Sequence, residues 1–134
     1  MRAQLLKIVM GVFLSCLFVV SCADEEKEEV KFKVISYGGK FTGDYSADSE
    51  TNIKFTVVGL GGNDYYYENT VEIKNQLEIN ADADSTTDAN TMTSLEIKVY
   101  VDGSFVKNGS STSSPITKFT VRYNKGDSAT ETTE

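Results

Sequence analysis

The sequence contains no histidine and no tryptophan, and it has only two cysteines and one proline in 134 residues. The lack of histidine removes the side chain that most often serves as general base, proton shuttle or metal ligand. Histidine-dependent catalytic triads and most zinc sites are therefore excluded. The chain is also too short for more than one domain of the usual size, about 100 to 200 residues.

Positive charge is scarce as well. The 13 Lys and Arg residues are outnumbered by 20 Asp and Glu residues, which gives a formal net charge of -7 at pH 7. Proteins that bind nucleic acid neutralise phosphates with a basic stripe or patch. The composition therefore argues against DNA or RNA as a partner, and the acidity is a source of solubility rather than of a specific chemistry.

The longest apolar run lies near the N-terminus and has the layout of a secretory signal. Arg2 and Lys7 precede the apolar residues 8–20, and small residues follow. This run has 13 residues, whereas a helix needs about 20 to cross the hydrocarbon layer of a membrane. We therefore expect residues 1–21 to be a cleaved signal peptide rather than a permanent transmembrane helix.

The end of this signal resembles the lipobox of bacterial lipoproteins. Val19, Val20 and Ser21 are the aliphatic and small residues that precede the obligatory cysteine of that family, here Cys22. The resemblance implies that the Cys22 thiol receives diacylglycerol, that its freed amine takes a further acyl chain, and that the membrane is a partner. One acyl chain holds a protein only marginally, whereas two or three make the attachment effectively permanent.

Two other outcomes remain open for this segment. Ser21, Cys22 and Ala23 also fit the small-x-small pattern of an ordinary signal peptidase, which would cut after Ala23 and release a soluble protein. Alternatively, the segment stays uncut and acts as a weak anchor. In each cleaved form Cys16 leaves with the signal, so the mature chain cannot form an internal disulfide.

An acidic segment follows Cys22. Five of the six residues 24–29 are Asp or Glu, and like charges extend a linker. We expect residues 22–29 to form a lipidated tether that holds the domain on the order of 20 Å from the membrane. The segment resembles the acidic export signal of Bacteroidota surface lipoproteins, and Ala23 in place of Asp disfavours retention at the inner membrane. These resemblances imply a lipid anchor at the outer membrane of a Gram-negative bacterium, on the cell surface or the periplasmic face.

From Val30 onward, apolar residues recur at every second position, which is typical of strands with one buried face. The alternation is clear in five stretches, 30–34, 53–57, 77–83, 95–101 and 117–123. Two less regular strands are expected at about 40–47 and 64–73. No window has convincing helical periodicity. The prediction is an all-β domain of about seven strands over residues 30–125, arranged as an immunoglobulin-like antiparallel β-sandwich.

The sharpest turn signal is the pair Asp102-Gly103. This pair readily supplies the two positive φ angles of a type I′ hairpin, so it should join strands at 94–101 and 104–107. At the other extreme, residues 126–134 are small, polar and acidic, and they are expected to form a disordered tail. Within that tail, the triplet Asp127-Ser128-Ala129 resembles an O-glycosylation site of Bacteroidota envelope proteins.

Two of the predicted segments resemble a known family. Residues 30–34 and the hairpin 95–107 are similar to the first strand and the Asp-Gly hairpin of MmpS, the small membrane proteins of mycobacteria. Members of that family are membrane-anchored β-sandwich proteins that serve export systems as non-enzymatic accessories. The resemblance implies an accessory role without catalytic residues, with a lipid anchor in place of the transmembrane helix of the family.

A tyrosine cluster is the first candidate ligand site. Tyr65, Tyr66 and Tyr67 follow Asn63 and Asp64, and strand geometry places Tyr66 on the face opposite to the other two rings. At least one ring should be in the core and at least one exposed, where it could stack on a sugar or a partner protein. The simpler interpretation is packing and cross-strand pairing. A concavity bordered by these rings would favour ligand binding.

An acidic cluster is the second candidate. It comprises oxygen-bearing residues of the type that calcium prefers: Asn80, Asp82, Asp84, Asp88 and Asn90. The spacing mimics the start of an EF-hand loop, but the sixth and twelfth positions are Ser85 and Thr91 instead of Gly and Glu. The alternative is a solvated acidic edge. No other metal and no cofactor are expected.

These patterns predict a non-catalytic, lipid-anchored envelope protein that acts as a binding, adhesion or accessory module, with an envelope protein or a glycan as partner. The alternative is a ligand-binding module for a glycan, calcium or a small apolar molecule. A sandwich of this size rarely has a cleft deep enough for catalysis, so we do not expect an enzyme.

Overall fold

The computed structural model describes residues 25–128, 130 and 131. The predicted signal peptide and the first three residues of the predicted tether, 22–24, which include Cys22, therefore lie outside the described residues. None of the helices in the described ranges is long and apolar enough to cross a membrane.

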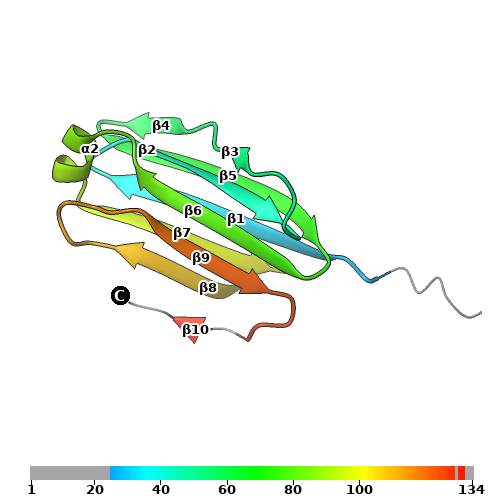
Figure 1. Cartoon of the computed structure of the whole chain (residues 1–134). Coiled ribbons are helices and arrows are strands. Elements are labelled where there is room, and N and C mark those ends of the chain that lie inside the picture. Colours follow the sequence, from blue (N-terminus) through cyan, green and yellow to red (C-terminus); the bar gives the residue numbers. More distant parts are fainter. Residues whose placement is uncertain (1–24, 129, 132–134) are drawn as a thin grey trace, which may run out of the picture.

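The chain folds into two sheets that pack face to face as a β-sandwich (Figure 1). The larger sheet contains, in spatial order, β10 (Thr130–Glu131), β8 (Ser104–Ser111), β7 (Ser94–Val101), β1 (Glu28–Tyr37), β5 (Asp64–Ile73) and β4 (Val58–Gly61). Its neighbours pair antiparallel except for β10, which runs parallel to β8.

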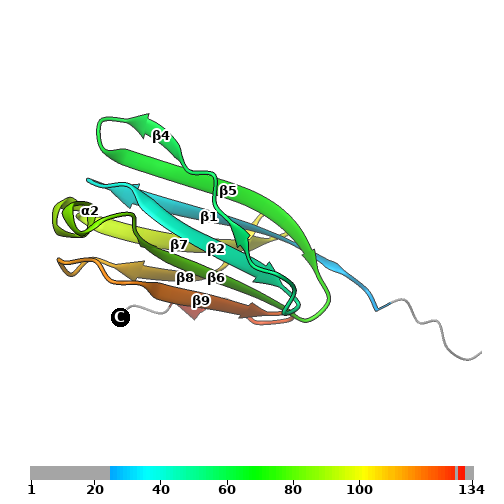
Figure 2. The ribbon, with the colours of Figure 1, turned by 45° about the horizontal axis from the view of Figure 1, so that its top comes forward.

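The smaller sheet is antiparallel throughout. It contains, in spatial order, β3 (Ile53–Lys54), β2 (Phe41–Ala47), β6 (Gln76–Ala83) and β9 (Phe119–Asn124). Across the sandwich, β2 contacts β5, β6 contacts β7, and β8 contacts β9. Figure 2 shows the result from another side: β4 and β5 lie along one long side of the molecule, and β8 and β9 lie along the other.

The core lies between the sheets, where the alternating apolar residues of the central strands point inward. Every second residue of β1 from Val30 to Val34 is fully buried, as are those of β6 from Leu77 to Ala81 and of β7 from Leu95 to Val99. The last inward residues of β6 and β7, Ala83 and Val101, are partly buried. Full burial of such side chains stabilises the fold by about 1.5 to 3 kcal/mol each. The alternation in the sequence thus predicted the core-facing residues of these strands correctly.

The Asp-Gly hairpin is also confirmed. Asp102 and Gly103 both have positive φ, 50° and 76°, and they connect β7 directly to β8. The second strand is longer than predicted and continues to Ser111, because β8 keeps its pairing with β7 up to the pair of Leu95 and Ser111.

The predicted strand 53–57 is wrong. Only Ile53–Lys54 pairs with β2, and Val58–Gly61, predicted in part as a turn, forms β4 at the edge of the other sheet. The physical reason is that this segment crosses from one sheet to the other. Phe55 turns inward and packs against the core, whereas Ile53 is 53% exposed.

The predicted absence of helix is wrong too. Residues Thr86–Thr91 form the short helix α2, whose N-cap Ser85 accepts a hydrogen bond from the Asp88 N–H at 3.1 Å. Six residues are too few to show helical periodicity, but Ser85 and Asp88 have the spacing of an N-terminal capping box, with Asp in place of Glu.

Both ends of the predicted domain are shifted as well. β1 begins at Glu28, inside the predicted tether. Part of the tail predicted to be disordered is ordered, because the Asn124 N–H donates to Asp127 Oδ2 at 2.9 Å and β10 pairs with Lys107 and Asn108 of β8.

Candidate functional site

The tyrosine cluster alternates between the two faces of the larger sheet, as strand geometry predicted, but all three residues are half-buried. The Tyr67 ring stacks on Phe55, with ring centroids 4.6 Å apart, and lies 5.9 Å from Phe32. Tyr65 also packs against the core. Tyr66 lies on the opposite face of the larger sheet, where its cross-strand partner is Ile35. The three rings therefore do not border one common surface.

Tyr66 is held by its neighbours on the outer face. Its hydroxyl donates to Glu68 Oε2 at 2.5 Å, and burial together with this carboxylate raises the pKa of Tyr66 to about 12. The same hydrogen bond, with Lys31 at 3.0 Å and Lys33 at 3.4 Å, lowers the pKa of Glu68 to about 2. The polar atoms of this face are thus committed to one another.

Asp64 has a structural contact. Its Oδ1 accepts a hydrogen bond from the Gly38 N–H at 3.1 Å, which fixes the turn between β1 and β2, where Gly38 has a φ of 87°. Asn63 is exposed in the turn between β4 and β5. Asn63, Asp64 and the three tyrosines do not line the groove that is described below.

The acidic cluster is not assembled into a cation site. Asp88 accepts hydrogen bonds from the Lys40 N–H at 3.0 Å and the Ser85 hydroxyl at 2.5 Å. Asp84 lies 3.4 Å from Lys40 Nζ, while Asp82 lies on the outer face of β6 opposite Thr42. Within the described ranges, no three acidic, cysteine or histidine side chains are grouped so that they could hold a metal ion.

A groove lies along the side of the sandwich where β8 and β9 face each other. It encloses about 500 Å³ and is lined by residues of both strands and of the segment before β9: Lys107, Asn108, Gly109, Ser110, Lys118, Phe119, Thr120, Val121 and Arg122. Three of these residues are cationic and none is acidic. We call this hollow the cationic groove. In a chain of net charge -7, it is a local concentration of positive charge.

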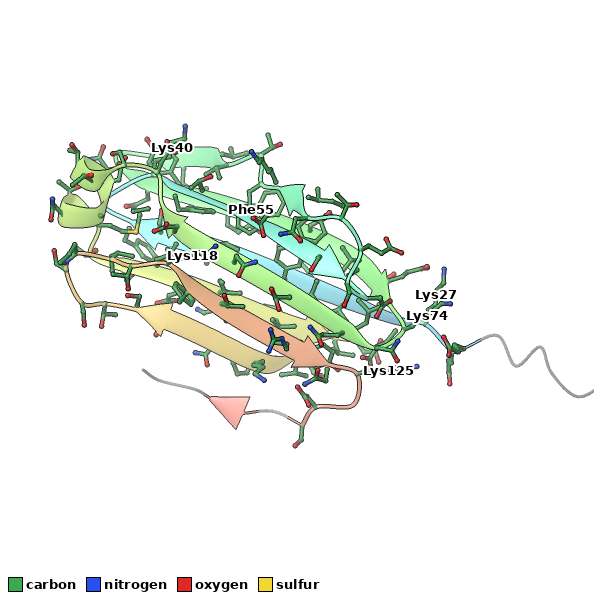
Figure 3. The ribbon with its side chains drawn as sticks, in the orientation of Figure 1. Lys27, Lys40, Phe55, Lys74, Lys118 and Lys125 are labelled. Carbon is green, nitrogen blue, oxygen red and sulfur yellow. The ribbon has the colours of Figure 1, made fainter. Side chains whose placement is uncertain are left out.

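The three cations of the cationic groove have different surroundings. Lys107 Nζ lies 3.5 Å from Asp127, and Arg122 Nη2 lies 2.5 Å from Glu78 Oε2. The hydrogen bond from Arg122 holds the pKa of Glu78 below its usual value. Lys118 makes no ion pair with any described carboxylate. Figure 3 shows it at the start of β9, beside β6.

The local sequence explains why β8 and β9 come so close. A Cβ on Gly109 would lie only 2.5 Å from Val121 Cγ2 and 3.3 Å from Phe119 Cε2, so the absence of a side chain permits the approach. Beside it, Asn108 Oδ1 is buried and has no hydrogen-bond partner among the described atoms. A buried oxygen without a hydrogen-bond partner destabilises a fold, and a ligand N–H group that reached this oxygen would remove that cost.

β9 is the edge of the smaller sheet. Its inner side is paired with β6, and no described strand pairs with its other side. Val121 and Tyr123 are buried, whereas Thr120 and Arg122 are exposed. The free side of β9 therefore offers unpaired backbone groups next to the cationic groove.

The cationic groove was not predicted from the sequence. Lys118, Thr120 and Arg122 alternate on a predicted strand, which is a signal that they share a face. However, only the strand pairing shows that β9 is an edge and that Lys107 from the other sheet lies across from it.

Three lysines gather at the end of the molecule where the chain enters β1. Figure 3 shows Lys27, Lys74 and Lys125 at this end. Lys27 pairs with Glu72 at 3.0 Å, Lys74 pairs with Glu25 at 3.5 Å, and Lys125 donates to the carbonyl oxygen of Glu26. We call this the basic end. It attaches the acidic residues before β1 to the domain.

Comparison with known proteins gives no assignment, since no protein-family model matches the chain and no curated protein matches it.

Proposed function

We propose that this chain is a non-catalytic, lipid-anchored envelope protein that binds a partner through the cationic groove. The observation that supports it best is the groove itself, in which three cations and a free strand edge lie together on an otherwise acidic chain. None of the described residues that line the groove is a carboxylate, a histidine or a cysteine, and the neighbouring carboxylates of Glu78 and Asp127 are paired with Arg122 and Lys107. Binding is therefore the role that the chemistry of the groove favours.

The anchor in this proposal is Cys22, which carries diacylglycerol and an N-acyl chain. Glu28, the first residue of β1, is the sixth residue after Cys22. An extended chain covers about 3.5 Å per residue, so the basic end would stay within roughly 20 Å of the membrane.

We further propose the outer membrane of a Gram-negative bacterium as the location, on the cell surface or the periplasmic face. The acidic residues after Cys22 and Ala23 support this proposal through their resemblance to export signals. An immunoglobulin-like sandwich is the fold that we propose at finer detail. It is supported by the chain passing repeatedly between the sheets, at β1 to β2, β5 to β6, β6 to β7 and β8 to β9.

A glycan as partner of the tyrosine cluster is less favoured. Tyr65 and Tyr67 pack in the core, and the Tyr66 hydroxyl is bonded to Glu68. An envelope protein is the better candidate, because a free strand edge recognises a polypeptide backbone.

Fatty-acid labelling tests the anchor. Cells that express the full chain are grown with an alkyne fatty acid, and the wild type is compared with Cys22→Ser and with the control Cys16→Ser. We expect label and membrane association in the wild type and in Cys16→Ser, and neither in Cys22→Ser. Label in Cys22→Ser, or a mature N-terminus other than Cys22 by intact mass spectrometry, would contradict the proposal.

A further inference from the structure

We infer that the cationic groove binds an extended acidic peptide of a partner protein, which adds as a strand to the free edge of β9. This inference rests on the proposed function as a binding module and names the class of its ligand. It does not depend on the lipid anchor.

The cationic groove is lined by positive charge. Lys107, Lys118 and Arg122 line the groove without a single carboxylate among the described lining residues. Lys118 in particular has no ion pair among the residues that the structure describes. Because the chain as a whole is acidic, an anionic ligand would meet attraction at this groove and repulsion over much of the remaining surface.

The free edge of β9 offers backbone groups for pairing. β9 pairs with no described strand other than β6, so its other side offers unpaired N–H and C=O groups along residues 119–123, whereas both backbone groups of Asn124 bond to Asp127. An extended peptide that pairs with such an edge gains affinity from main-chain hydrogen bonds, and its side chains give specificity. A polyanionic sugar would use the cations but would leave these backbone groups without a matching strand.

The chain itself contains an added strand on this side of the sandwich. The parallel strand β10 pairs with β8 at Lys107 and Asn108, and both of these residues line the cationic groove. The added segment is Thr130–Glu131, which is extended and includes an acidic residue. This side of the sandwich thus already accepts an added strand.

The pleat of β9 predicts the pattern of the ligand. Side chains of an added strand alternate between the two faces, like those of β9 itself. On the outer face they would lie beside Thr120 and Arg122, about 5 Å away across the strands. On the inner side they would lie near the buried Val121. The preferred peptide therefore alternates acidic residues with small apolar ones.

The test is fluorescence anisotropy with a labelled peptide of about eight residues that alternates Glu and Val, a length typical of a strand. Its two controls are the same peptide with Lys in place of Glu, and the same peptide with N-methylated alternate amides. The protein is the full mature chain in detergent, both lipidated and as Cys22→Ser. Equal binding by both forms shows that the result is independent of the anchor.

We expect the Glu-Val peptide alone to bind, and we expect amide hydrogen exchange to slow in β9. Lys118→Ala should weaken binding about fivefold, the upper range for one exposed charge. The matched control is Lys31→Ala, because Lys31 lies on β1 in the larger sheet, pairs with Glu68, and lines neither of the hollows that Lys118 lines. It should change binding by less than about twofold. A thermal unfolding curve for each variant confirms that it is folded.

Four results would overturn the inference. Equal binding of the N-methylated peptide, or tighter binding of a sulfated polysaccharide, would show that the groove recognises charge without strand addition. Equal losses in Lys118→Ala and Lys31→Ala would place the site elsewhere. No binding by any of the probes would mean that the charges only protect the edge of β9 from aggregation, a common use of edge lysines.

Discussion

The two long sides of the sandwich differ in how the space between the two sheets is filled at the edge. On the side of β4 and β5, the chain itself crosses between the sheets, and Phe55 fills the opening with ring centroids 4.6 Å from Tyr67 and 6.0 Å from Phe41. On the side of β8 and β9, no aromatic pair bridges the described parts of the two strands, and the opening is the cationic groove. We call them the closed side and the open side.

The difference shows how one fold separates stability from recognition. Aromatic rings that bury large areas contribute most where water is excluded, which is the closed side. An unpaired edge with lysine and arginine contributes little to stability, but it leaves backbone groups available to a partner. Substitutions of the buried rings on the closed side should therefore alter unfolding, and substitutions of the exposed charges on the open side should alter binding.

The largest expected effect is the loss of Phe32, which lies on β1 in the core and packs against the rings that fill the closed side. Its ring is fully buried and lies 5.0 Å from Tyr45 and 5.9 Å from Tyr67, between centroids. Phe32→Ala should lower the free energy of unfolding by about 3 to 5 kcal/mol, because it leaves a cavity among rings. The control is Phe105→Ala on the outer face, where the ring contacts Tyr100. Urea unfolding should find a much smaller loss there, and equal losses would refute the distinction.

Gly109→Ala tests the closeness of β8 and β9 on the open side. The added methyl group would meet Val121 at 2.5 Å, so the two strands must move apart. Such overpacking costs about 1 to 3 kcal/mol. Gly59→Ala is the matched control, since its Cβ would meet nothing nearer than Tyr65 at 3.7 Å. A stable Gly109→Ala variant, measured by thermal unfolding, would mean that the strands lie further apart than described.

Asp48 links the turn after β2 to the turn between β5 and β6. Its carboxylate accepts hydrogen bonds from the backbone N–H groups of Lys74, Asn75 and Gln76 at 2.7, 2.7 and 2.9 Å. Burial alone would raise the pKa of Asp48, but these hydrogen bonds outweigh it and lower the pKa. Asp48→Asn should cost about 1 to 2 kcal/mol at pH 7.

The effect of Asp48 should depend on pH in a defined direction. A lowered pKa in the folded state stabilises the protein above the unfolded value of about 3.9, and this contribution disappears as the pH falls below it. The difference in unfolding free energy between wild type and Asp48→Asn should therefore shrink from pH 7 to pH 3. A difference that grows on acidification would contradict the hydrogen-bond arrangement.

The smallest effect is expected on the outer face of the larger sheet, away from both sides. Tyr66→Phe removes the hydrogen bond to Glu68 and should cost about 0.5 to 1.5 kcal/mol. It should also raise the pKa of Glu68 from about 2 toward its ordinary value. NMR titration of the Glu68 carboxyl measures this shift, and an unchanged titration would mean that Lys31 and Lys33 alone hold the carboxylate.

Local patterns in the sequence were sufficient for the core strands and the hairpin. Val30, Phe32 and Val34 alternate with lysines, and Asp102-Gly103 carries its turn geometry in its own residue types. The crossing at Phe55 could not be predicted this way, because alternation continues through 53–57 although the chain changes sheet there.

The candidate sites show the same limit more strongly. Residues near in sequence are not brought into one site: Asp82 lies within β6, whereas Asp84 lies just after it and pairs with Lys40. The residues that do come together, Lys107 and Lys118, lie on opposite sheets and meet only through the pairing order of whole strands. Long-range strand order is not encoded in a local pattern.

Site-specific photocrosslinking in native cells tests most directly whether the open side is the partner-binding surface. A photoreactive residue is placed at Thr120 on β9, which lines the cationic groove, or at Thr70 on β5, on the outer face of the larger sheet. The account predicts a protein adduct from Thr120 and none from Thr70. An adduct from Thr70 alone, or no adduct from Thr120, would contradict it.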